Sequence, residues 1–221
     1  AEDDEIILCL NYDGLYGINN INRFLQESNP NEPIEWGIQR FKVGDPVLFN
    51  ENERFRTGVY NNMKGKIRSI EIVDEDEPQE RIVFDVELEK VIDGMDAFGA
   101  DFMLVDDEYP DAENSVIRFY VNKLKSTDED DDNSACDVIP FQVAYAVSIH
   151  KAQGLEYSSV KIVITDEVDE LITHNIFYTA ITRAQKKLKI YWTPEVEKKV
   201  LSTIKPKDIN KDINILKQYG L

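Results

Sequence analysis

Two short stretches of this sequence carry side chains suited to phosphate chemistry, and the more specific one is residues 175–185. Phe177 and Ile181 lie four residues apart, which predicts a helix with one side toward a core and Asn175 as its N-cap. Arg183 would project from another side of that helix. A guanidinium stays charged and can contact two oxygens at once, so it can stabilise a phosphoryl group during its transfer. The alternative is an exposed or ion-paired surface arginine.

The second stretch, residues 145–156, places polar groups at the end of an expected strand. Three side chains within four residues offer a hydroxyl, an imidazole and an ammonium: Ser148, His150 and Lys151. Such groups suit hydrogen bonds to a nucleic-acid phosphate or sugar. A strand-to-helix transition at this point would add free N–H groups and a helix dipole. Gly154 would let the backbone approach a ligand closely, and Glu156 could hold a ribose hydroxyl. The alternative is an ordinary strand end with a surface histidine.

The charge distribution argues against a protein that grips DNA mainly by charge. The 221 residues have a net charge of −18 at pH 7. Residues 71–140 hold 23 acidic and five basic residues, so the whole surplus lies in the middle of the chain. Nucleic acid would therefore contact the neutral flanks and avoid the acidic face of residues 71–137, or it would not be the partner.

The composition, 42% hydrophobic and 31% charged, is typical of a soluble globular protein. No apolar run approaches the roughly 18 to 20 residues that cross a bilayer, and the first residues do not form a secretory signal. The two cysteines, Cys9 and Cys136, form no CxxC pair, so no metal site is expected. We predict a cytoplasmic protein that does not contact a membrane.

Hydrophobic periodicity predicts an α/β domain that both ends of the chain form and that a unit of β-strands interrupts. The apolar run at residues 6–10 predicts a buried strand, and Ile18, Ile21 and Leu25 have helical spacing. Expected strands in the middle of the chain cover residues 47–49, 66–73, 81–88 and 116–121. Expected later elements are strands at 143–147, 160–164 and 188–192, and helices at 175–184 and 194–204.

The two polar stretches resemble the last two motifs of superfamily 1 helicases of the RecD/TraA-like group. Tyr178-Thr-Ala-Ile-Thr-Arg-Ala184 follows Val147-Ser-Ile-His-Lys-Ala-Gln-Gly-Leu-Glu156 by about twenty residues, and the resemblance covers most of residues 6–192. It implies a second RecA-like motor domain, of the α/β class, interrupted by an SH3-like barrel. The implied divisions are residues 1–36 and 140–221 for the motor domain, 37–139 for the insertion and 126–134 for an acidic linker within it.

The resemblance also implies roles for individual residues. Arg183 would be an arginine finger that completes an ATP site, and Tyr178 would lie beside the nucleotide. The remaining residues expected at the nucleotide cleft are Gln153, Gly154 and Glu156. The residues expected to face single-stranded DNA are Ser148, His150 and Lys151.

ATP and Mg²⁺ would be bound mainly by an N-terminal RecA-like domain of the same protein. The 221 residues contain no Gly-x-x-x-x-Gly-Lys-Ser/Thr loop, so we expect no ATP hydrolysis by this chain alone. Two alternatives stay open. One is a helicase-derived acidic module that docks a basic protein partner without ATPase activity. The other is an RNA helicase fragment or an RNA-processing factor, because contacts to a backbone do not distinguish sugars.

Overall fold

The computed structural model describes residues 4–50, 53–55, 58–73, 80–95, 97–123, 138–166 and 173–203. The acidic linker expected at residues 126–134 lies outside these residues, as does Cys136. The described residues form a parallel sheet, a larger antiparallel sheet and a two-stranded hairpin.

Strands from both ends of the chain build the parallel sheet. Their spatial order is β10 (Ala146–Ser148), β1 (Glu5–Cys9), β11 (Tyr157–Val163) and β12 (Ala184–Tyr191). β1 pairs in parallel with two neighbours, so that Leu8 lies opposite both Val147 and Ile162. The first strand of the chain is therefore central to a sheet that later strands complete. This arrangement confirms the expected α/β class.

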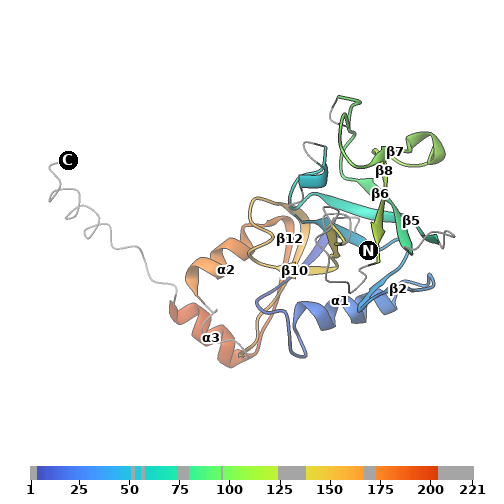
Figure 1. Cartoon of the computed structure of the whole chain (residues 1–221). Coiled ribbons are helices and arrows are strands. Elements are labelled where there is room, and N and C mark those ends of the chain that lie inside the picture. The colour runs from blue at the N-terminus through green and yellow to red at the C-terminus, as the bar shows by residue number, and fades with distance from the viewer. Residues whose placement is uncertain are drawn as a thin grey trace, which may run out of the picture.

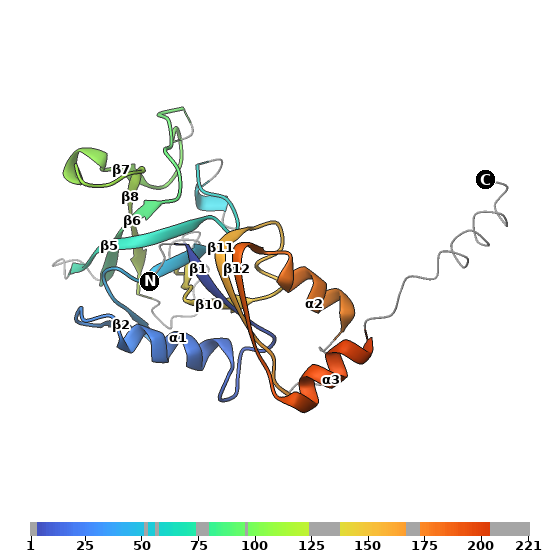
Figure 2. The same ribbon diagram turned by 180° about the vertical axis from the view of Figure 1, so that it is seen from behind.

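Helices cover both faces of the parallel sheet, because successive residues of a strand point to opposite faces and both sets are apolar here. The helices are α1 (Ile18–Glu27), α2 (His174–Ile181) and α3 (Pro194–Thr203). Ile18 of α1 packs against the face that carries Cys9. Ala180 and Val200 of α2 and α3 pack on the face that carries Leu8. Both views show α2 and α3 beside each other, far from the antiparallel strands (Figures 1 and 2).

The antiparallel sheet contains six strands and the largest apolar cluster. In spatial order they are β7 (Met103–Leu104), β8 (Val116–Asn122), β6 (Arg81–Leu88), β5 (Lys64–Val73), β4 (Pro46–Phe49) and β9 (Phe141–Val143). A hairpin of β2 (Ile34–Trp36) and β3 (Gln39–Phe41) precedes them. Phe41 meets the rings of Phe84 and Phe141 edge to face, a geometry that aromatic pairs prefer. The strands expected in the middle of the chain are confirmed, whereas closure into an SH3-like barrel stays a prediction.

The single strand expected at residues 143–147 is wrong. The chain instead divides there into β9, which pairs with β4 in the antiparallel sheet, and β10, which pairs with β1 in the parallel sheet. Ala144 and Tyr145 make the crossing, and the Ala144 amide donates to the Pro46 carbonyl (2.8 Å). The residues run apolar through the crossing, so periodicity does not reveal it. The division into domains at residues 36/37 and 139/140 stays a prediction.

A buried carboxylate joins the two sheets beside this crossing. Asp45 is fully buried and accepts hydrogen bonds from the Lys42 amide (2.8 Å), the Asn29 side chain (2.9 Å) and the Tyr145 hydroxyl (2.9 Å). The side-chain amide of Gln26, near the end of α1, donates a further bond to this carboxylate. One side chain thus satisfies donors from α1, the turn before β4 and the link between β9 and β10, which fixes the sheets relative to each other.

Among the described residues, no helix combines the length and apolar character needed to span a bilayer. The same residues contain no group of three or more His, Cys, Asp or Glu side chains arranged to hold a metal ion.

Candidate functional site

The chain leaves the parallel sheet after β10 through a series of turns, so the expected strand-to-helix transition is wrong. Backbone bonds run from the Gln153 amide to the His150 carbonyl (3.2 Å) and from the Leu155 amide to the Ala152 carbonyl (3.1 Å). Gly154 has φ +82°, in the left-handed region that glycine tolerates best, and it reverses the chain before β11. Because these amides are bonded to carbonyls within the turns, no helix N-terminus is available here to bind an anion.

The helix that precedes Arg183 also differs at both ends from the sequence prediction. Its N-cap is Thr173, whose hydroxyl accepts from the Ile176 amide (3.3 Å), rather than Asn175. α2 ends at Ile181, and the Arg183 amide bonds to the Ala180 carbonyl (3.2 Å), three residues back, instead of continuing the helical pattern. The Thr182 hydroxyl donates to the Tyr178 and Thr179 carbonyls (both 3.0 Å) at this end of the helix. Arg183 therefore lies in the turn between α2 and β12 and does not project from the helix.

Hydrogen bonds hold the half-buried Arg183 side chain against the turns that follow β10. Its Nε donates to the Thr179 carbonyl, its Nη1 to the Leu155 carbonyl and its Nη2 to the Thr182 hydroxyl, each at 3.0 Å. The Tyr157 amide donates in return to the Arg183 carbonyl (2.9 Å). A guanidinium has five N–H groups, so this anchoring leaves donors for a further ligand.

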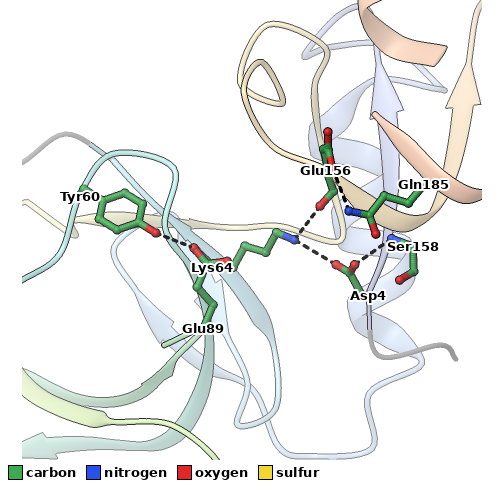
Figure 3. A network of polar contacts seen from close by, with 7 residues as sticks. All are labelled: Asp4, Tyr60, Lys64, Glu89, Glu156, Ser158 and Gln185. Atoms are coloured by element: carbon green, nitrogen blue, oxygen red, sulfur yellow. Dashed lines mark hydrogen bonds and ion pairs between the residues drawn. The ribbon is translucent and has the colours of Figure 1, made fainter. Parts of the chain in front are cut away.

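The residues expected at a nucleotide lie around this arginine. Gln153, Gly154 and Glu156 are all exposed in the loop whose Leu155 carbonyl accepts from Arg183. The Glu156 carboxylate accepts a 2.9 Å hydrogen bond from the Gln185 side chain at the start of β12 (Figure 3). The structure therefore brings the two sequence motifs together, and Gln185 is a participant that the sequence analysis did not identify.

Tyr178 shares the helix that ends beside Arg183. Its side chain is 58% exposed, and its carbonyl accepts from the Thr182 hydroxyl that closes α2. An exposed aromatic ring on this helix could pack against a planar ligand group.

The residues expected to face single-stranded DNA differ in accessibility. Ser148 is 5% exposed, and its hydroxyl accepts from the Lys151 amide (3.2 Å). The Lys151 ammonium donates to Asn50 (2.8 Å) and to Gln142 of β9 (2.7 Å), and burial lowers the pKa of this lysine. His150 is exposed. Of the three side chains, only the His150 imidazole is fully open to a ligand in this arrangement.

Sequence comparisons relate this chain to helicases. Residues 143–191 match the sequence model of the UvrD-like helicase C-terminal domain. An uncharacterized protein of Methanocaldococcus jannaschii is 30% identical over 203 residues, which cover 90% of this chain and 15% of that protein. The RecBCD enzyme subunit RecD of Buchnera aphidicola subsp. Schizaphis graminum is 22% identical over 195 residues, covering 86% of this chain and 25% of RecD.

Solved structures show the same fold in Pif1 helicases. Pif1 helicase from Candida albicans superposes with a TM-score of 0.51 at 16% identity, covering 99% of this chain and 51% of that chain. Bacteroides Pif1 bound to ssDNA gives a TM-score of 0.50 at 15% identity, covering all of this chain and 47% of that one. At these identities the likeness shows the fold alone.

The parallel sheet with helices on both faces is the RecA-like α/β fold of a helicase domain. More particularly, the match of residues 143–191 to the UvrD-like helicase C-terminal domain and the similarity to RecD support a superfamily 1 helicase C-terminal domain. The chain spans about a quarter or less of the curated relatives it matches.

Proposed function

We propose that this chain is the second motor domain of an ATP-dependent DNA helicase and supplies the arginine finger, Arg183. The observation that most supports this role is the anchoring of its guanidinium on the Leu155 carbonyl (3.0 Å), beside the exposed Gly154 and Glu156. An arginine that is already oriented and still has free N–H groups loses little freedom when it contacts a transferring phosphoryl group.

ATP and Mg²⁺ would be held mainly by a first RecA-like domain, which would be the principal intramolecular partner of this chain. The sequence lacks the Gly-x-x-x-x-Gly-Lys-Ser/Thr loop that cradles phosphates. Closure of the two domains on ATP would bring Arg183 to the γ-phosphate, with Tyr178, Gln153, Gly154 and Glu156 lining this side of the cleft. This chain alone would not turn over ATP.

Single-stranded DNA would be the polymer on which the motor acts. A Pif1 structure with the same fold has bound ssDNA, and the exposed His150 lies in the turns next to the Arg183 loop. In this proposal His150 contacts the strand directly. Ser148 and Lys151 shape the turns, and Lys151 has one N–H beyond the two bonds it makes to Asn50 and Gln142.

The test is steady-state ATPase activity of the intact protein with Arg183→Ala. We expect turnover to fall by roughly 10³-fold, the lower end of arginine-finger effects, while affinity for single-stranded DNA is retained. Lys186→Ala is the matched control, because Lys186 is an exposed cation in β12, three residues after Arg183. Unchanged turnover in Arg183→Ala would refute the assigned role. In the same assay, comparing the stimulation of ATPase turnover by single-stranded DNA with that by single-stranded RNA decides between a DNA motor and an RNA motor.

The acidity of the middle of the chain supports a second candidate function, the docking of a basic protein partner. Residues 71–140 account for the whole net charge of −18. A complex with such a partner should weaken steeply with salt. Two results together would favour the docking module over the motor. One is an upstream sequence without a phosphate-binding loop, and the other is a basic partner that dissociates as the salt concentration rises.

A further inference from the structure

We infer that Lys64 is a positioning residue for Arg183, through which the antiparallel sheet holds the loop that orients the arginine; this rests on the proposed role of Arg183. Lys64 is the first residue of β5, and its side chain reaches out of the antiparallel sheet to the parallel one (Figure 3). The ammonium donates to the Glu156 carbonyl (3.2 Å) and to Oδ1 of Asp4 (3.0 Å), the residue that precedes β1. It also lies 3.9 Å from the centre of the Tyr157 ring.

The Glu156 carbonyl is one peptide unit from the atom that anchors the arginine. Leu155, whose carbonyl accepts from Arg183 Nη1, immediately precedes Glu156. Tyr157, whose amide donates to the Arg183 carbonyl, immediately follows it. The lysine therefore holds the middle of a three-residue segment whose two outer members bond to Arg183.

The opposite end of Lys64 is fixed within the antiparallel sheet. Its amide donates to the Glu89 carboxylate (3.3 Å), and the Glu89 amide donates to the Lys64 carbonyl (3.1 Å). The Tyr60 hydroxyl donates to the same carboxylate (3.2 Å), as Figure 3 shows. With its backbone held in one sheet and its ammonium held in the other, Lys64 transmits a displacement of either sheet to the Arg183 loop.

The chemistry of the site requires a long cation. The Lys64 side chain is 27% exposed, and its ammonium contacts a carboxylate, a carbonyl and an aromatic face, all of which favour positive charge. Methionine would preserve the length and much of the packing of the stem but none of these polar contacts. Arginine would preserve the charge and the donors.

The test is a double-mutant cycle on ATPase turnover of the intact protein, with Lys64→Met, Arg183→Ala and the combination. We expect Lys64→Met alone to lower kcat about tenfold, because small displacements of a positioned group reduce rates strongly, with the KM for ATP changed little. Lys64→Arg should restore most of the turnover. In the Arg183→Ala background, Lys64→Met should lower kcat by less than about twofold, since coupled residues are not additive. Lys66→Met is the control, an exposed lysine two positions along the same strand.

The possible outcomes separate this inference from the proposed function. If Arg183→Ala leaves turnover unchanged, the proposed function fails. If Arg183→Ala lowers turnover but Lys64→Met does not, or lowers it equally in both backgrounds, Lys64 does not act through Arg183. Should Lys64→Met prevent folding, hydrogen exchange at the Tyr157 amide is measured in the milder Lys64→Gln variant. Faster exchange there supports the inference, and unchanged exchange overturns it.

Discussion

The Nη1 of Arg183 lies 3.0 Å from the carbonyl oxygen of Leu155, to which it donates a hydrogen bond. The two residues are 28 positions apart and belong to the two motifs that the sequence analysis identified. The bond makes the position of the guanidinium depend on the backbone of residues 153–156. Changes to that backbone should therefore affect the arginine as well as stability.

Gly154→Ala should destabilise the protein by roughly 1 to 2 kcal/mol, the penalty for a side chain in the left-handed region. Gly154 has φ +82° and open space where a Cβ would lie, so backbone strain rather than a clash is the cause. Gly94→Ala is the matched control: Gly94 also has open space around it but no left-handed φ, so its substitution should be neutral or slightly stabilising. Urea denaturation of both variants measures the difference, and equal stabilities would contradict the assigned strain.

Asp45→Ala should be more destabilising than Tyr145→Phe. The first leaves the Lys42 amide and one N–H of the buried Gln26 side chain without an acceptor, at ~1 to 3 kcal/mol each. The second removes one donor and leaves the carboxylate its other hydrogen bonds, so about 1 kcal/mol is expected. Thermal unfolding ranks the two variants. A Tyr145→Phe effect as large as that of Asp45→Ala would show that the carboxylate does not join the sheets as described.

Cys9 should resist alkylation in the folded protein. It is fully buried in β1, and burial raises the pKa of its thiol to about 12, so almost no thiolate exists at pH 8. Iodoacetamide followed by mass spectrometry should find Cys9 unmodified until denaturant is added. Modification at the rate of a free thiol under native conditions would contradict this burial.

Acid should weaken the link between the Lys64 ammonium and the parallel sheet. Burial tends to raise the pKa of Asp4, but hydrogen bonds from Lys64 and the Ser158 amide outweigh it and hold the pKa below its ordinary value of 3.8. The pKa of Asp4 is lower in the folded state than in the unfolded state. The Asp4 carboxylate therefore stabilises the fold above pH 3.8, and this contribution is lost as the pH falls through the folded-state pKa. The melting temperature of Asp4→Asn should therefore approach that of the natural sequence as the pH falls below about 4. A difference in melting temperature between the two proteins that stays constant from pH 7 to pH 3 would contradict this prediction.

The sequence predicts the parts of the fold that depend on local apolar patterns. The run at residues 6–10 is continuously apolar, and the run at 160–164 is interrupted only by Lys161, because β1 and β11 lie inside a sheet that is covered on both faces. Hydrophobic periodicity does not predict the early end of α2, where the Arg183 amide bonds three residues back and the Thr182 hydroxyl donates to two carbonyls. The division of residues 143–147 between two sheets is likewise invisible, since both strands are apolar.

The two motifs of the site are predictable from their residue types, but the residues that hold the motifs in place are not. Arg183 and the loop at Gly154 are recognisable as a spaced pair of motifs. Lys64 is not, because its partners Asp4 and Glu156 are 60 and 92 positions away and only the folded chain brings them together. The chemistry of Ser148 and Lys151 alone predicts contacts to DNA, whereas the burial of Ser148 and the bonds from Lys151 to Asn50 and Gln142 follow from the packing of β9 and β10.

The affinity of the intact protein for ADP–aluminium fluoride, compared with its affinity for ADP, tests the central claim most directly. An arginine finger acts on the charge of the transferring group, so it should strengthen binding of a transition-state analogue far more than binding of the product. We predict that Arg183→Ala weakens binding of the analogue by about 10²-fold or more and leaves ADP affinity nearly unchanged. Equal affinities of the variant and the natural protein for the analogue would contradict the account.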